Sequence, residues 1–178
     1  SFKKNYNLHV KYGVKRQTNN FPVSIVGYNS INLDTSLDEN VYPNLNYNER
    51  YVYISQLLIS RRFSDKFSLQ LSPSIIKHNF LTTQSKTDYN YVLNTGSRLK
   101  ISKRSSFNLD YSYHLNRLKN SSEKNVLSVG VDMETGGHVF QLLFSNTQAS
   151  DEAGVLTGAE GDWLKGDVFF GFNILRVF

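Results

Sequence analysis

The sequence lacks cysteine altogether and holds only three prolines and one tryptophan among its 178 residues. Without cysteine the chain cannot carry disulfides, cysteine-ligated zinc, iron–sulfur clusters or a thiol nucleophile. It also lacks any run of about 18 apolar residues, which excludes a transmembrane helix. A membrane-spanning β-barrel is not excluded, because its strands alternate between apolar and polar residues and contain no such run.

The chain is mildly basic, with a net charge of +5, and its aromatic residues make up 13% of the sequence. That aromatic content is well above what a disordered chain holds. The basic residues form separate pairs instead of one arm or one helix, so nucleic acid is not an expected partner. The chain opens on Ser1 without a signal-peptide pattern, and we expect that a leader or a longer segment was removed upstream.

Apolar residues recur with a period of two, which is typical of β-strands. Between Phe107 and Leu115 every second residue is apolar, and the residues between them are polar. Similar segments along the chain predict nine strands, and no window has helical spacing. The expected strands cover residues 6–14, 21–33, 51–60, 67–78, 93–101, 107–116, 127–134, 140–144 and 166–178.

Two hairpins can be interpreted down to their register. A turn at 103–105 would pair Leu99 with Leu109, Ile101 with Phe107 and Arg98 with Asp110. The next hairpin turns at Gly136 and Gly137, which can both adopt positive φ as a type I′ turn requires. That turn would pair Phe140 with Met133, Leu142 with Val131 and Phe144 with Val129.

Connections alternate between tight turns and long loops, which favours an antiparallel up-and-down barrel with two different ends. Two barrels fit this pattern. A soluble, lipocalin-like carrier of an apolar ligand would place Leu109, Tyr111 and Leu142 inside. A transmembrane barrel would turn them toward lipid.

Three features favour the transmembrane barrel. The polar face is rich in Asn, Ser and Gly instead of Lys and Glu, and each strand has about ten alternating residues, the length of a tilted membrane span. Aromatic residues gather toward the strand ends, as in interfacial girdles. They are Tyr47, Tyr51, Tyr53, Tyr89 and Tyr91 at the long-loop end and Phe63, Phe67 and Phe107 at the short-turn end.

The last strand alternates through Phe170, Phe172 and Ile174 and ends on Phe178. This ending resembles the terminal strand of bacterial outer-membrane proteins, which implies recognition by the barrel-assembly machinery. Two internal segments, residues 137–146 (GHVFQLLFSN) and 56–65 (QLLISRRFSD), resemble a Bacteroidota outer-membrane β-barrel family. That family has no assigned activity, so the resemblance implies a fold and a location only.

We therefore expect one domain over residues 1–178, an all-β transmembrane barrel in a bacterial outer membrane. Short turns of such barrels lie in the periplasm, which would place the carboxy-terminus there. A single-chain barrel has an even number of strands. Nine visible strands therefore predict at least one missing strand before Ser1 and ten or more in the full protein.

This topology gathers charges in two places. We expect a network of charged side chains in the lumen and a basic rim at the periplasmic end. The rim would lie near phospholipid headgroups or an acidic partner. The lumen set is Arg98, Lys100, Asp110, Asp132 and Glu134; the rim set is Lys15, Arg16, Arg61, Arg62, Lys103 and Arg104. The long loops carry most of the acidic residues, Asp151, Glu152 and Asp162 among them.

No motif indicates catalysis, a metal or another cofactor. The four histidines lie on different strands without a metal-binding spacing, and Ser112 with His114 is not a positioned dyad. The leading hypothesis is a non-enzymatic structural or accessory barrel whose partners are outer-membrane lipid, the assembly machinery and a membrane or periplasmic protein. The first alternative is a narrow, porin-like solute or ion channel through the charged lumen. The second alternative is the soluble carrier.

Overall fold

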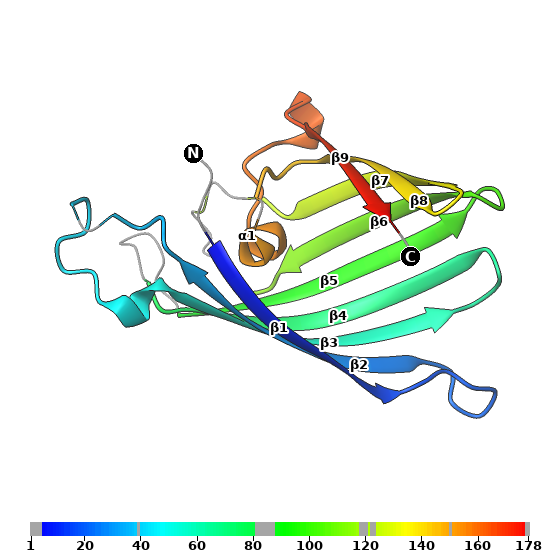
Figure 1. Ribbon diagram of the computed structural model, residues 1–178, viewed down its shortest axis with the longest axis horizontal. Helices are drawn as coiled ribbons and strands as arrows, with labels where there is room; N and C mark the ends of the chain where they lie inside the picture. The colour runs from blue at the N-terminus through cyan, green and yellow to red at the C-terminus, as the bar shows by residue number, and fades with distance from the viewer. Residues whose placement is uncertain are drawn as a thin grey trace.

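The computed structural model describes residues 5–38, 40–80, 88–117, 121, 124–149 and 151–176. Nine antiparallel strands form one sheet in which each strand pairs with its neighbours in sequence, as the alternation predicts. Figure 1 shows this sheet curved into a trough, with short turns at one end and longer loops at the other. In the described residues β1 and β9 are its two edges and do not pair with each other. The strands are β1 (Asn5–Lys15), β2 (Ser24–Asp34), β3 (Tyr51–Arg62), β4 (Phe67–His78), β5 (Tyr89–Lys100), β6 (Ser105–His114), β7 (Val126–Thr135), β8 (His138–Ser145) and β9 (Phe169–Arg176).

The apolar residues of the strands lie on the outer face of the trough. Leu109 and Tyr111 are exposed there, whereas Ser106 and Ser112 on the other face of the same strand are each only 1% exposed. A soluble barrel would show the opposite pattern, because its apolar face must be buried from water. The soluble alternative is therefore wrong about these residues, and the outer face matches a surface that meets lipid.

The hairpin of β7 and β8 has the predicted register. Val129 pairs with Phe144, Val131 with Leu142 and Met133 with Phe140. Gly136 and Gly137 have φ values of 54° and 102°, the left-handed conformations that a two-residue hairpin turn requires.

The hairpin of β5 and β6 differs from the prediction by two residues. Leu99 pairs with Phe107, Arg98 with Asn108 and Gly96 with Asp110. The centre of the turn lies one residue earlier than expected, because the backbone N–H groups of Ile101 and Ser102 both donate to the Ser105 carbonyl, at 2.9 and 3.1 Å. β6 therefore begins at Ser105, and the expected pair of Arg98 with Asp110 does not form.

The expectation that no segment is helical is wrong at three places. These are η1 (Tyr47–Arg50), α1 (Glu152–Thr157) and η2 (Trp163–Lys165). The carboxylate of Asp151 caps α1 by accepting a hydrogen bond from the Gly154 backbone N–H at 3.1 Å. A six-residue helix is too short to show a 3.6-residue period. None of the described helices is long and apolar enough to cross a membrane.

Candidate functional site

The loop between β8 and β9 carries α1, which lies inside the trough (Figure 1). Asn146 fixes its beginning. The Asn146 side chain accepts from the Leu127 backbone N–H at 2.8 Å and donates to the carbonyls of Asn125 at 3.0 Å and Gly161 at 3.3 Å. Asn146 is only 3% exposed. One buried amide thus joins the start and the second half of the loop to the start of β7.

The second half of the loop is held against the connection between β6 and β7. Lys124 and Ala159 exchange two backbone hydrogen bonds, and the Lys124 ammonium bonds the Asp162 carboxylate. The hydrogen bond from Lys124 is the main cause that lowers the pKa of Asp162. A Cβ atom on Gly161 would lie 2.1 Å from the Asp167 carbonyl oxygen, so only glycine fits at this crossing.

The Trp163 indole N–H adds a hydrogen bond to the Leu127 carbonyl, at 2.9 Å. The tryptophan therefore reports on the same contact between the loop and β7 that Asn146 makes.

One side of α1 packs on an apolar patch of the inner wall at the long-loop end. Ala153 and Leu156 are 2% and 7% exposed. They form one buried cluster with Ile54, Ile76 and Val92, from β3, β4 and β5. These three inward-facing residues interrupt the polar lining of the wall. The helix therefore covers this part of the inner wall with a dry contact, called the apolar seal below.

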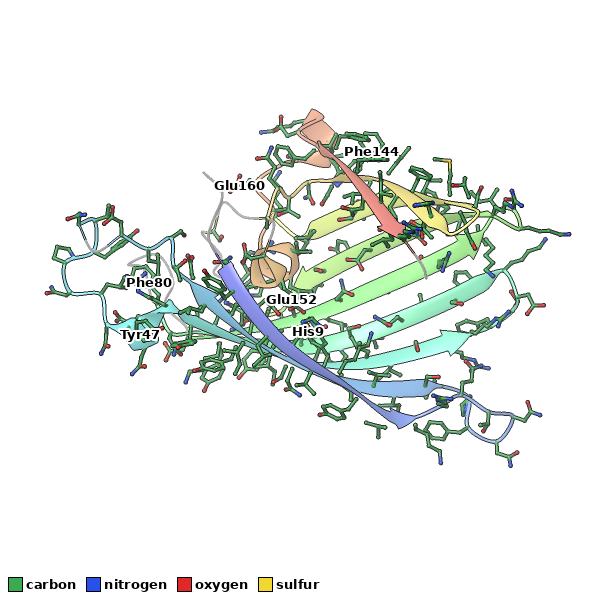
Figure 2. All side chains as sticks on the ribbon, in the orientation of Figure 1. His9, Tyr47, Phe80, Phe144, Glu152 and Glu160 are labelled. Carbon is green, nitrogen blue, oxygen red and sulfur yellow. The ribbon has the colours of Figure 1, made fainter. Side chains whose placement is uncertain are left out.

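A second anchor of α1 is Glu152, which lies inside the trough (Figure 2). Its carboxylate accepts hydrogen bonds from the Tyr28 hydroxyl at 2.8 Å, the Ser30 hydroxyl at 3.0 Å and the Gln56 amide at 3.2 Å. These donors lie on β2 and β3. A hydrogen bond to a carboxylate contributes about 1.5–3 kcal/mol, so Glu152 ties α1 to β2 and β3, beside the apolar seal.

A cavity of about 890 Å³ lies between α1 and the short-turn end of the trough. Its wall consists mainly of Ser, Asn, Gln and Gly residues from β3 to β8, with Val155 and Leu156 of α1 on one side. The charged residues of its lining are Asp110, Asp132, Asp151, Glu152 and Arg98. Negative charge therefore exceeds positive charge in the described lining, which favours cations and neutral polar molecules over anions.

The predicted lumen network is present in part. Arg98 donates from Nε to the Ser106 hydroxyl at 3.0 Å, and its guanidinium lies 3.8 Å from the Asp132 carboxylate. Asp110 instead accepts a hydrogen bond from the Asn94 amide, at 2.8 Å. Lys100 and Glu134 are exposed and do not line the cavity.

All six residues of the predicted basic rim are exposed. Arg62 pairs with Asp65 at 2.7 Å, and the Arg61 guanidinium lies 4.8 Å from the centre of the Phe63 ring. Lys15 lies over Phe21, at 5.7 Å. The pairs Lys15–Arg16, Arg61–Arg62 and Lys103–Arg104 lie at three separate short turns.

The predicted assembly signal lies on the outer face of β9. Phe170 packs against Phe144, with ring centres 5.4 Å apart, and Phe172 stacks on Phe140 at 6.3 Å. Ile174 pairs with Phe140 across the strands and is exposed. Phe178 lies outside the described residues.

Sequence reasoning missed α1 because it placed Asp151 and Glu152 in an outer loop. The signal that was available is local: a capping Asp151 is followed by Ala153, Val155 and Leu156 in an otherwise polar loop. Among the described residues no group of three or more His, Asp and Glu side chains is arranged to hold a metal ion.

Comparison with known proteins agrees with this geometry. Neither the curated proteins nor the solved structures contain a match to the chain. A family model described as "Membrane bound beta barrel domain (DUF5777)" matches residues 1–178. The match agrees with the apolar outer face and with the nine up-and-down strands. The chain therefore belongs to the DUF5777 family of membrane-bound β-barrel domains.

Proposed function

We propose that this protein is a bacterial outer-membrane barrel of the Bacteroidota type whose lumen is closed by its own β8–β9 loop. Its role is structural or accessory, without catalytic activity. The apolar seal carries this proposal, since Ala153 and Leu156 of α1 exclude water from the inner wall at the long-loop end. Ions do not cross a dry apolar contact, because their desolvation costs far more than the contact returns.

The surfaces outside the lumen support the same role. With the short turns in the periplasm, the exposed basic rim lies where phospholipid headgroups or an acidic periplasmic partner would meet it. The apolar outer face of β9 presents the terminal aromatic residues to the assembly machinery during insertion.

Conductance in a planar bilayer tests the closed lumen, with the full-length protein as the sample. The wild type should be silent. Leu156→Asp places a charge in the apolar seal and should give steady ion currents. The matched control is Leu164→Asp in the same loop, where the side chain is 97% exposed; this variant should stay silent. Steady currents from the wild type would overturn the proposal.

The second candidate is a narrow pathway for small cations or neutral polar solutes. The polar cavity of about 890 Å³ with its excess of carboxylates favours this candidate. It predicts a conducting, cation-selective wild type whose selectivity falls in Asp110→Asn. A silent wild type together with a conducting Leu156→Asp variant would decide for the closed barrel.

A further inference from the structure

A polar pair interrupts the apolar outer face of the barrel in the middle of a strand. Asn29 is the central residue of β2 (Ser24–Asp34), and the Ser55 hydroxyl of β3 donates to its Oδ1 at 2.8 Å. Both side chains are exposed. Their cross-strand neighbours on the same face, Val10 and Ile75, are apolar.

The carboxamide of Asn29 has more hydrogen-bonding groups than its surroundings satisfy. The bond from Ser55 occupies one lone pair of Oδ1, and no described residue accepts from Nδ2. In the hydrocarbon layer neither water nor lipid tails can accept these two N–H groups, and an unsatisfied polar group there is costly. The headgroups that could accept them lie at the ends of the strands, away from the centre of β2.

The neighbours of Asn29 on the outer face differ in size, since Gly27 and Ser55 are small whereas Val10 and Ile31 are branched. Gly27 lies next on the same face of β2, and only the ring of Tyr12 leans over it, since a Cβ on Gly27 would lie 2.3 Å from the Tyr12 Cζ. The hydrogen-bond ladder between β3 and β4 is also interrupted close to Ser55. The ladder between β3 and β4 has no pair at Pro73 or Ser72, and proline lacks the N–H that a ladder requires.

We propose that the outer face of β2 and β3 is an interface with a second copy of this chain. A carboxamide is both donor and acceptor, so Asn29 is complementary to itself. Across a two-fold axis, each Asn29 donates from Nδ2 to the free lone pair of Oδ1 on the other copy, and the same patch serves both copies. Polar side chains that form hydrogen bonds across the contact also help transmembrane helices to associate. The inference needs the membrane location and does not depend on the closed lumen.

Disulfide cross-linking in native membranes tests this interface, and residues 1–178 contain no cysteine that could compete. Ile31→Cys lies beside Asn29 on the same outer face of β2, where the wild-type side chain is 42% exposed, and it leaves the Asn29 carboxamide in place. In the full-length protein this variant should give a covalent dimer on oxidation. The control is Thr95→Cys, a small polar residue on the outer face in the middle of β5 (Tyr89–Lys100), which should stay monomeric. Equal cross-linking of the two variants would indicate random collision and overturn the proposal.

The mass of the purified wild type in mild detergent provides a second readout that needs no variant. Light scattering should give a dimer, and Asn29→Leu should shift the population to monomer. A monomeric wild type, or a dimer that Asn29→Leu leaves intact, would overturn the proposal. Heat-modified migration on a gel shows that each variant has folded, so a misfolded barrel is not mistaken for a lost interface.

Discussion

Thiol chemistry can measure how firmly α1 is held in the lumen, because the wild-type chain has no cysteine. Ala153 is 2% exposed inside the apolar seal, so a cysteine in Ala153→Cys can react with a water-soluble reagent only when α1 leaves the wall. Leu164 is 97% exposed in the same loop, and Leu164→Cys gives the rate of an unprotected thiol. We expect the thiol at position 153 to react far more slowly than the thiol at position 164.

The second substitution is Leu156→Ala, made in both cysteine backgrounds. Truncation of a buried leucine costs about 3 kcal/mol, and each 1.4 kcal/mol changes an equilibrium about tenfold. If this cost falls on the docked state of α1, labelling at position 153 should accelerate by about a hundredfold. Labelling at position 164 should not change.

Two results would refute this reasoning. Equal rates at positions 153 and 164 in the otherwise unaltered protein would mean that α1 is not docked in the apolar seal. A slow rate at position 153 that Leu156→Ala leaves unchanged would mean that other contacts hold the helix. Glu152→Ala then identifies them, because it removes the three hydrogen bonds to β2 and β3 and leaves the seal intact.

Three further predictions concern the loop and one hairpin. Gly161→Ala should displace the loop, because the added Cβ meets a backbone oxygen at 2.1 Å; the fluorescence of Trp163, the single tryptophan, should shift to the red. The pKa of Asp162 is lowered chiefly by the hydrogen bond from Lys124. The pair therefore stabilises the loop at pH values above the ordinary carboxyl pKa. This stabilisation is lost as the pH falls through the lowered pKa of Asp162. The same fluorescence should therefore be constant from neutral pH to about pH 5 and change below about pH 4, and Asp162→Asn should abolish that step. Gly136→Ala forces alanine into a positive φ of 54° and should lower the free energy of unfolding by about 1 kcal/mol in urea titrations of the barrel in vesicles, with a smaller loss for Gly136→Asn.

Alternation along the strands was sufficient to predict the sheet, whereas its orientation also required the composition of the polar face, the strand length and the positions of the aromatic residues. The number of strands, their antiparallel order and the outward position of residues such as Leu109 follow from a period of two plus the location of the aromatic residues. The β7–β8 register was predictable for a local reason: Gly136 and Gly137 both adopt positive φ, and a two-residue turn of that kind leaves one choice of pairing.

The β5–β6 register was less determined by local sequence. Residues 102–106 contain three serines with a lysine and an arginine, and such a polar stretch fits turns of several lengths. A shift of two residues keeps every side chain on its own face, so the apolar pattern cannot detect it. Arg98 therefore stayed in the lumen as predicted but met Asp132 instead of Asp110.

The inward fold of the β8–β9 loop has a signal elsewhere in the chain, in the strands that it covers. Between Ile54 and Ile59 β3 is apolar on both faces, so the sequence alone does not show which face of this strand points outward. In a membrane barrel one of those faces meets lipid, and an apolar residue on the other face must be covered by protein to avoid contact with water. Ile54 is 1% exposed because α1 covers it. An apolar residue at a lumen position therefore predicts an inserted segment, and the loop that combines a capping Asp151 with Ala153 and Leu156 is the one able to supply it.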